Sequence, residues 1–467
     1  MRLYNTLTGE EKEFAPADGK TVKMYVCGVT PYSSTHVGHA LSYVVFDTLR
    51  RYLEYQGYQV RHIQNFTDVD DKIIQRAQEA GISEDELTER YIDDYFRTMD
   101  ALNIQRAEAY PRATQEIGPI LDTIGNLVDK GYAYPAGGDV YFRVNRKEDY
   151  GKLSHRSLEG MIAGARVQVD EDKEHPMDFV LWKGAKPGEP SWDSPWGPGR
   201  PGWHIECTAM SLRYLDYPLD IHGGGQDLIF PHHENEIAQS EAHTGIQPFA
   251  HHWVHNGLLQ LGEDKMSKSL GNLVSVEEAL ATYSADALRT YFLSSHYRSP
   301  LQYSDEGSAA MERSMDRFRH ALRPATEDEA AIEATNQGQE PLDSDPYLER
   351  FMGAMDDDLN TPQAIAALFD LARDINRERG AGRSVKAAQS RLREMGGILG
   401  LTFEEPAARN DELAAKPFID LLVSTRTELR QARQFELADR IRDQLASQGV
   451  MLEDSAQGTT WRYQRSA

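Results

Sequence analysis

The stretch Val22–Cys27 reads VKMYVC and predicts a buried β-strand, because apolar residues fill most of its positions. A helical pattern of apolar residues follows, ends near Gly57, and leads to a second apolar run at Val60–Phe66. Two short strands joined by one helix predict a right-handed crossover between parallel strands, which opens a doubly wound, Rossmann-like α/β sheet. Such sheets bind ligands at the carboxyl ends of their strands, so Cys27 is expected to face a ligand site.

A His-x-Gly-His sequence, His36–His39, lies at the start of this predicted helix. Ser34 and Thr35 offer side-chain oxygens for the N-cap. Two imidazoles and the free N–H groups of a helix N-terminus can bind the anionic oxygens of a phosphate chain and stabilise charge that develops there. Gly38 would let a flat base or ribose approach closely. The alternative is a coincidental pattern on a core helix.

A lysine-rich segment, Lys265–Ser269 (KMSKS), lies much further along the chain, between Gly262 and Gly271. Lys265 and Lys268 can bring two positive charges to a leaving pyrophosphate, and the flanking glycines suggest a loop that closes on a ligand. An exposed cationic patch is the alternative. Together, and in this order, the two motifs predict an enzyme that activates its substrate with a nucleoside triphosphate.

Four residues of metal-ligand type accompany these motifs. Cys27 ends the first strand, Cys207 lies on a predicted helix, and His232 and Glu236 are spaced so that both project from one helix face. Two thiolates, an imidazole and a carboxylate make a tetrahedral zinc set. His233 could replace His232, and two inert buried cysteines without a metal are the alternative.

The region between the two halves of the predicted sheet has a different texture. Residues 112–202 contain short β-type runs and a loop rich in Pro, Gly and Trp, and are predicted to be an insertion. The sheet pattern then resumes with a helix at Trp203–Leu212, a strand at Leu219–His222, a tight turn at Gly223–Gly225 and a helix at Phe230–His243.

The segment His222–Gly225 (HGGG) resembles the oxyanion loop of some esterases. That interpretation requires a Gly-x-Ser-x-Gly elbow, and the sequence contains none. A glycine floor beneath a nucleoside, with Gly224 at its centre, is the preferred interpretation.

Beyond Ala285 the sequence looks all-helical until a short β-type tail at Val450–Arg462. Acidic or apolar-poor segments predict linkers at Pro324–Pro346 and Thr402–Lys416. The helix around Ala438–Asp443 and the tail can be a base-reading module for unstacked RNA, or a solvated amphipathic helix beside an ordinary strand.

Composition sets the broad class of this 467-residue chain. Hydrophobic residues make up 40%, enough for a core, and there is no run of about 18 apolar residues that would span a membrane. The N-terminus lacks a secretory signal, and two distant cysteines fit a reducing cytoplasm better than a disulfide framework. The net charge of −24 argues against a polyanionic partner unless a local basic track exists.

The chain resembles the cysteinyl-tRNA synthetases, a family of class I aminoacyl-tRNA synthetases, over nearly its whole length. The resemblance rests on Met24–Gly28 (MYVCG), His36–His39 (HVGH), Thr67–Lys72 (TDVDDK), Pro176–Lys183 (PMDFVLWK), Gly199–Cys207 (GRPGWHIEC), Asp220–Glu236 (DIHGGGQDLIFPHHENE), Lys265–Ser269 (KMSKS) and Gly458–Arg462 (GTTWR). The first signature reads His-Val-Gly-His where the family has His-Ile-Gly-His, a loss of one methylene that should not change the chemistry.

The resemblance implies a domain order. It consists of a Rossmann catalytic domain in two halves (1–111 and 203–261) split by a connective insertion (112–202), a stem-contact region (262–323), a helical bundle (324–401) and a small C-terminal anticodon-binding domain (402–467).

The resemblance also implies roles for particular residues. The zinc ligands are Cys27, Cys207, His232 and Glu236, the amino-acid pocket contains Thr67, Trp203 and His222, and the ATP-contacting lysine is Lys268. The chemistry of the motifs adds His36, Gly38, His39 and Gly224 to the predicted ATP site, and predicts that catalysis uses His36, His39, Lys265 and Lys268. Arg430, Asp439 and Asp454 match anticodon contacts by type, whereas Phe435 stands where a Trp can be found.

The implied activity is ATP-dependent formation of cysteinyl-adenylate, with Mg²⁺, followed by transfer to the 3′ end of a cysteine tRNA. Zinc would bind the substrate sulfur as a thiolate and reject serine by roughly 10⁴ or more, without an editing domain. The expected partners are tRNA, L-cysteine and ATP, and the expected state is a cytoplasmic monomer. Two alternatives stay open: a cysteine ligase acting on an amino sugar, and a non-catalytic RNA-binding paralogue.

Overall fold

The computed structural model describes residues 1–164, 172–261, 264–265, 274–326, 329, 340–404, 410–455 and 458–463. The chain divides into two compact units, Met1–Phe403 and Glu404–Ala467, which are described separately below. Within the described ranges, no helix is long and apolar enough to cross a membrane.

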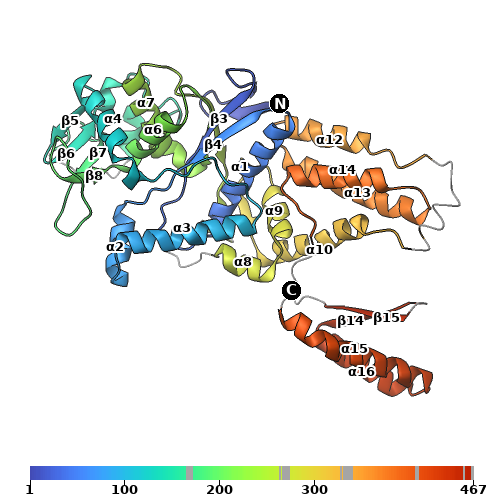
Figure 1. Cartoon of the computed structure of the whole chain (residues 1–467). Helices are drawn as coiled ribbons and strands as arrows, with labels where there is room; N and C mark the ends of the chain where they lie inside the picture. The colour runs from blue at the N-terminus through green and yellow to red at the C-terminus, as the bar shows by residue number, and fades with distance from the viewer. Residues whose placement is uncertain are drawn as a thin grey trace. The chain divides into compact units, whose positions relative to one another are not determined.

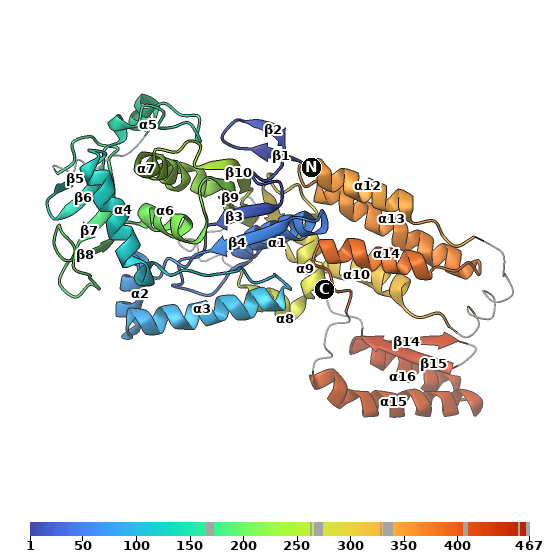
Figure 2. The same cartoon turned by 45° about the horizontal axis from the view of Figure 1, so that its top comes forward.

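A four-stranded parallel sheet forms the centre of the first unit (Figure 2). Its strands are β3 (Thr21–Val26), β4 (Gln59–Gln64), β9 (Leu219–Gly225) and β10 (Ala250–Asn256), in the order β10-β9-β3-β4. Every neighbouring pair is parallel, and Met24 lies between His62 of β4 and Ile221 of β9. The Rossmann-like α/β fold expected from the first strand–helix–strand pattern is confirmed.

Helix α1 (Val37–Tyr55) connects β3 to β4, and its N-cap differs from the prediction. The N-cap residue is His36, whose Nδ1 accepts the His39 N–H at 3.3 Å. Thr35 instead donates its own N–H to the Asp94 carboxylate at 3.0 Å. The prediction of a Ser34 or Thr35 cap was therefore wrong, because an imidazole nitrogen can accept the same hydrogen bond.

The predicted tight turn at Gly223–Gly225 was also wrong. These glycines continue β9 as extended strand and pair with Val254–Asn256 of β10. Close packing explains why glycine is needed at Gly223, because a Cβ there would lie 2.2 Å from the Phe46 ring of α1. Glycine here allows helix and sheet to approach each other, so a local turn signal was mistaken for a packing requirement.

Helix α6 (Trp203–Tyr214) precedes the inner strand β9, and helix α7 (Glu234–Thr244) follows it. The predicted helix at Trp203–Leu212 is confirmed, whereas the one at Phe230–His243 is wrong in its first turn. Phe230 has extended dihedral angles inside an irregular π-type turn, Ile229–His233, and regular helix begins at Glu234.

The region between β4 and β9 carries its own helices and a separate antiparallel sheet in the order β5-β6-β7-β8 (Figure 1). These elements are α2 (Asp71–Ala80), α3 (Glu84–Ala101), α4 (Ile117–Asp129), β5 (Ala133–Ala136), β6 (Asp139–Phe142), α5 (Leu158–Gly164), β7 (Phe179–Gly184) and β8 (Gly199–Pro201). A hairpin of β1 (Arg2–Asn5) and β2 (Glu10–Glu13) precedes the main sheet.

The remainder of the first unit is mostly helical. It comprises β11 (Leu259–Leu261), β12 (Asp264–Lys265), α8 (Val276–Thr282), α9 (Ala285–Leu293), β13 (Leu301–Tyr303), α10 (Asp305–Leu322), α12 (Asp345–Asp356), α13 (Thr361–Gly380) and α14 (Lys386–Ile398). The expectation of only helices beyond Ala285 was wrong, because Leu301–Tyr303 pairs in parallel with β11. The predicted linker at 324–346 lies largely outside the described residues.

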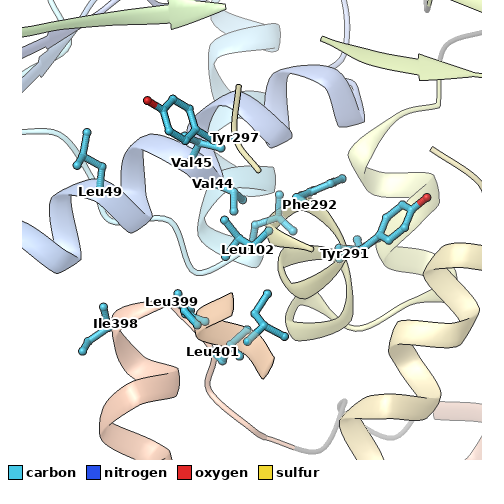
Figure 3. Close-up of a cluster of buried hydrophobic side chains, with 14 of the residues drawn as sticks. Val44, Val45, Leu49, Leu102, Tyr291, Phe292, Tyr297, Ile398, Leu399 and Leu401 are labelled. Atoms are coloured by element: carbon cyan, nitrogen blue, oxygen red, sulfur yellow. The ribbon is translucent and has the colours of Figure 1, made fainter. Parts of the chain in front are cut away.

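One continuous core joins the four-stranded parallel sheet to the helices that follow it. Figure 3 shows Val44 and Leu49 of α1 facing Phe292 of α9 and Leu399 at the end of α14, all with at most 1% of their surface exposed. Burial of this apolar surface favours a single rigid body, because roughly 25 cal/mol is gained for each Å² removed from water.

The second unit consists of α15 (Asn410–Gln431), α16 (Phe435–Ser447) and the hairpin of β14 (Val450–Ser455) and β15 (Gly458–Tyr463). The predicted terminal helices and β-type tail are confirmed. The linker predicted at Thr402–Lys416 was wrong over its second part, since helix α15 begins at Asn410.

Candidate metal centre and nucleotide site

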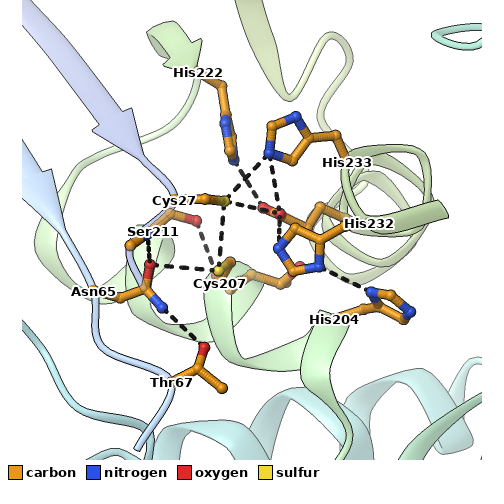
Figure 4. A network of polar contacts seen from close by, with 12 residues as sticks. Cys27, Asn65, Thr67, His204, Cys207, Ser211, His222, His232 and His233 are labelled. Carbon is orange, nitrogen blue, oxygen red and sulfur yellow. Dashed lines mark hydrogen bonds and ion pairs between the residues drawn. The ribbon is translucent and has the colours of Figure 1, made fainter. Parts of the chain in front are cut away.

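Four buried side chains converge beyond the carboxyl end of β3 (Figure 4). Cys27 follows that strand directly, Cys207 comes from α6, His232 from the irregular turn and Glu236 from the first turn of α7. One donor atom from each lies within 4.8 Å of the others. The two sulfur atoms are 3.8 Å apart, and His232 Nε2 is 2.8 Å from Glu236 Oε1.

The donor set has the chemistry of a zinc site. Cys27 is 7% exposed and the other three side chains at most 1%, so water does not satisfy their polar atoms. Two sulfurs, one imidazole nitrogen and one carboxylate oxygen suit a borderline-soft divalent ion in tetrahedral geometry. His204 Nδ1 lies 2.9 Å from His232 Nδ1 and orients that ring.

A second arrangement of donors shares two of these residues. Cys27, His222, His233 and Glu236 also bring one donor atom each within 4.8 Å of the others. His233 Nε2 is 3.3 Å from Cys27 Sγ, and its Nδ1 is 2.7 Å from His255 Nε2. Cys27 and Glu236 thus lie at the centre of a larger histidine-rich cluster.

Burial and the short contacts within the cluster shift the pKa values of its side chains. Burial raises the pKa of the Cys27 thiol, which donates toward Cys207. Although burial opposes ionisation of Cys207, the hydrogen bond from Cys27 lowers its pKa to about 6. Burial likewise opposes a charge on His232, but the Glu236 carboxylate raises the pKa of that imidazole to about 10.

The three residues assigned to the amino-acid pocket surround this cluster. The Trp203 ring stacks on His232 at 4.3 Å, and His222 Nε2 lies 2.8 Å from Glu236 Oε2. The Thr67 hydroxyl accepts a hydrogen bond from Asn65 at 3.4 Å (Figure 4).

Sequence analysis missed Asn65, which connects the two sides of the site. Its Oδ1 accepts the Gly28 N–H at 2.9 Å and lies 3.7 Å from Cys207 Sγ. Its position directly after β4, beside the end of β3, is the signal that could have identified it. A Cβ on Gly28 would lie 1.5 Å from the Asn65 carbonyl oxygen, so only glycine fits at Gly28.

His36 and His39 lie together at the start of α1, with stacked rings 3.6 Å apart between centroids. A Cβ on Gly38 would approach His36 Nδ1 to 3.0 Å, so this glycine makes room for the imidazole as well as for a ligand. Gly224 is similarly constrained, because a Cβ there would lie 2.9 Å from Leu228 and 3.0 Å from His233.

The lysine segment is only partly within the described residues. Lys265 ends β12, whereas Lys268 and the rest of Lys265–Ser269 lie outside them. The chain just downstream is held against the His36 turn: Val37 N–H donates to Val274 O at 3.0 Å, and Val276 N–H donates to Thr35 O at 2.9 Å. The described residues downstream of the lysine segment therefore lie beside the His36 turn.

The residues matched to anticodon contacts all lie in the second unit. Asp454 accepts two hydrogen bonds, at 2.9 and 2.8 Å, from Arg426, whose guanidinium lowers the pKa of that carboxyl. Arg430 lies 3.7 Å from Asp454. Phe435 is 55% exposed, and Asp439 is exposed on the same helix.

Comparison with known proteins defines the class first. Residues 13–313 match the family model described as the tRNA synthetases class I (C) catalytic domain, and residues 350–404 match the DALR domain. Methionyl-tRNA synthetase of Mycobacterium tuberculosis, solved in complex with methionyl-adenylate, shares the fold with a TM-score of 0.58 at 20% identity. The alignment covers 81% of this chain and 89% of that one. The fold is that of a class I aminoacyl-tRNA synthetase.

The sequence comparison then gives the particular family. The cysteine–tRNA ligase of Dehalococcoides mccartyi (strain 195) is 56% identical over 464 residues, covering 99% of both chains. That of Geobacter metallireducens is 48% identical over 484 aligned positions, again covering 99% of both. The chain belongs to the cysteine–tRNA ligase family.

Proposed function

We propose that this chain activates L-cysteine with ATP and transfers it to the 3′ end of a cysteine tRNA. The observation that carries the proposal is the buried Cys27–Cys207–His232–Glu236 cluster at the end of β3, a few residues before the His36–His39 helix start. A sulfur-selecting site beside a phosphate-binding helix is what the activation of cysteine requires.

In the first step, the cysteine carboxylate attacks the α-phosphorus of ATP, and pyrophosphate leaves as its magnesium complex. His36 and His39, at the N-terminus of α1, stabilise the charge on the phosphate oxygens. Lys265 and Lys268 neutralise the leaving pyrophosphate, and Gly38 and Gly224 leave space for the nucleoside. In the second step, a terminal ribose hydroxyl of the tRNA attacks the carbonyl carbon, and AMP leaves.

Cys27, Cys207, His232 and Glu236 would hold zinc. Bound there, zinc supplies a Lewis-acid position that takes the substrate sulfur as a thiolate. Serine cannot readily offer a soft anionic ligand, so its rejection needs no editing step. Thr67, Trp203 and His222 form the walls of the amino-acid pocket and exclude water around the sulfur.

The second unit would contact the anticodon. Phe435 offers an exposed ring for stacking, and Arg430 and Asp439 offer hydrogen-bonding groups on the same helical pair. Asp454 is held by Arg426 and would act mainly by orienting this surface. We assign the helical region 324–401 to the anticodon-stem side and 262–323 to stem contact, and expect a cytoplasmic monomer.

Coverage of the relatives favours this function over its two alternatives. A ligase that passes cysteine to an amino sugar would match only the catalytic part, whereas the cysteine–tRNA ligases match 99% of this chain. A non-catalytic paralogue has no need for His36, His39 and Lys268.

Metal analysis combined with cysteine-dependent ATP–pyrophosphate exchange tests the proposal. The purified protein is expected to carry one zinc per chain, to exchange with cysteine roughly 10⁴-fold better than with serine, and to charge cysteine tRNA. Cys207→Ser should lose zinc and raise the KM for cysteine steeply, while Arg213→Gln at the exposed end of the same helix should change neither. An unaltered KM in Cys207→Ser, or exchange without charging, would refute the assignment.

A further inference from the structure

A cavity of about 740 Å³ opens beside the His36 turn, and His36 is the one lining residue to which a catalytic or binding role is given above. It is bounded by the segment Tyr32–His36, by the α2–α3 hairpin, and by the start of α8 at Ser275. Figure 2 shows α3 and α8 next to each other, and Arg97 and Glu277 join them at 3.5 Å. Its size is within the range of about 300–1,000 Å³ that is typical of small-molecule sites.

The inner wall of this cavity is apolar and aromatic. A small hydrophobic cluster forms this wall. It contains Tyr32, from the segment before His36, and Ile82, Leu87 and Tyr91 of the α2–α3 hairpin. Leu87 is 4% exposed, so the cluster provides a firm surface. Two tyrosine rings above aliphatic side chains suit the flat face of an unstacked base.

The rim carries positive charge that is unusual in a chain with a net charge of −24. Arg90 lines the cavity and is exposed, with its guanidinium 5.6 Å from the Tyr91 ring. Lys72 does not line the cavity itself, but its ammonium group lies 5.4 Å from the ring of Tyr32, which does. Neither forms an ion pair with any residue in the described part of the chain. Cations held over aromatic rings bind phosphates and stack on bases.

The acidic side chains of the cavity are already held by local partners. Glu79 pairs with Arg76 at 3.0 Å, and Glu278 caps α8 through Ser275 at 2.8 and 2.9 Å. Their charge is therefore partly neutralised and opposes a phosphate less than free carboxylates would.

We propose that the cavity between Tyr32, Tyr91 and Arg90 binds a nucleotide of the single-stranded 3′ end of the tRNA. The base would lie against the Tyr32–Leu87–Tyr91 wall, and its phosphate would contact Arg90 and Lys72. His36 lines the same cavity, so a strand held there ends beside the proposed adenylate. This inference rests on the proposed function and adds to it the place where the acceptor strand enters. The apolar wall favours a base over the leaving pyrophosphate, which has no apolar surface to bury.

The experiment separates adenylate formation from transfer. Two variants are compared with wild type: the single variant Arg90→Gln and the double variant Lys72→Gln/Arg90→Gln. The first assay measures cysteine-dependent ATP–pyrophosphate exchange. The second measures single-turnover transfer of cysteine from preformed adenylate to a cysteine-tRNA transcript. Exchange is expected to stay within twofold of wild type. Transfer is expected to fall by tenfold or more in the double variant. Binding is measured with the full transcript and with one lacking its unpaired 3′ nucleotides, and the wild-type preference for the full transcript should disappear.

Arg97→Gln is the matched control, because Arg97 lies on the same helix but contacts Asp94 and Glu277 instead of the cavity. It should match wild type in both assays. Transfer by the double variant at the wild-type rate would overturn the proposal. An equal loss of exchange and transfer would also overturn it, and would place pyrophosphate in the cavity. A wild-type protein that shows no exchange, or that exchanges without charging, would instead refute the proposed function.

Discussion

At the scale of single residues, two of the proposed metal ligands carry protons that a metal ion would displace. The Cys27 thiol has a raised pKa because it is buried, and His232 has a pKa of about 10 because Glu236 faces it. Both groups are therefore protonated at neutral pH in the metal-free protein, whereas Cys207, with a pKa of about 6, is mostly a thiolate. Metal ions bind the deprotonated forms, so binding must release the two protons.

The affinity for zinc should consequently rise with pH. Between pH 6.5 and 8, both protons are present in the metal-free state and absent in the bound state, so the affinity should increase by about 100-fold per pH unit. Competition against a chromophoric chelator at several pH values measures the slope. Calorimetry in buffers of different ionisation enthalpy counts the protons independently, and a slope near zero would contradict this account.

Gly28 carries a second prediction at this scale. A Cβ there would lie 1.5 Å from the Asn65 carbonyl oxygen, so Gly28→Ala must displace the end of β3 or of β4. The free energy of unfolding should fall by about 1–3 kcal/mol or more, and zinc affinity should fall with it because Cys27 moves. Chemical denaturation and chelator competition measure the two effects.

Gly125→Ala provides the contrast, since Gly125 lies within helix α4 and an added Cβ would meet nothing within 4 Å. It should stabilise the chain by about 0.5–1 kcal/mol. If Gly28→Ala were as stable as wild type, the close approach of Gly28 to the Asn65 carbonyl oxygen would be contradicted.

From the sequence, the residues with metal-binding chemistry could be predicted, whereas the residues that matter through packing could not. Residue type and helical spacing suggested Cys27, Cys207, His232 and Glu236, with His233 as an alternative to His232, and the structure brings the donor atoms of the suggested set together. Asn65 could not be found in that way, because it acts through its position beside the end of β3. The contacts that require Gly28 and Gly223 are likewise with residues distant in sequence.

At the scale of elements, Arg289 joins three parts of the first unit. Its fully buried guanidinium contacts Asp47 of α1 at 2.6 Å, the Leu102 carbonyl after α3 at 3.0 Å, and the Leu399 carbonyl after α14 at 2.8 Å. Gly400 has a φ of +74°, and a Cβ there would lie 2.1 Å from the guanidinium. The ion pair therefore fixes α1, which begins at His36, against the helices that follow the sheet.

Arg289→Met should lower the free energy of unfolding of the first unit by about 3–5 kcal/mol, because it leaves buried acceptors without their donor. Denaturant titration followed by circular dichroism gives the value. Arg317→Met, at an exposed position of α10, should change it by no more than about 0.5 kcal/mol. Similar stabilities for the two variants would contradict the role of Arg289.

The elements themselves were predictable where a periodic pattern extended over many residues. The strands at Val22–Cys27 and Val60–Phe66 and the helix at Trp203–Leu212 correspond to β3, β4 and α6. The predictions failed where local and tertiary signals conflict. Three glycines suggest a turn in sequence but lie in a strand packed against α1, and β13 is too short to show a period.

At the scale of the whole molecule, the two units have separate cores. The second is held together by Ile419, Val423, Leu445, Val450 and Leu452. The first contains the sheet, the metal-ligand cluster and the helices packed on α1. Adenylate chemistry and anticodon contact are thus assigned to units that do not share a core.

Removal of residues 404–467 should therefore separate the two activities. The shortened chain is expected to keep cysteine-dependent ATP–pyrophosphate exchange within a few-fold of the full chain, while its kcat/KM for tRNA charging falls by about 100-fold or more. Phe435→Ala in the full chain should give a smaller loss in the same direction, of about 1–3 kcal/mol in transition-state binding if one base stacks on the ring. Loss of exchange in the shortened chain would show that the units depend on each other.

The wide spacing of the proposed metal ligands along the chain has a consequence for biosynthesis. Cys27 and Glu236 are 209 residues apart. A ribosome adds about 5–20 residues per second, so Cys27 emerges about 10–40 s before its last partner has been made. Zinc cannot template the early stages of folding during translation. The nascent chain has to bring four distant segments together first, and the ion can be captured only after half of the polypeptide has been synthesised.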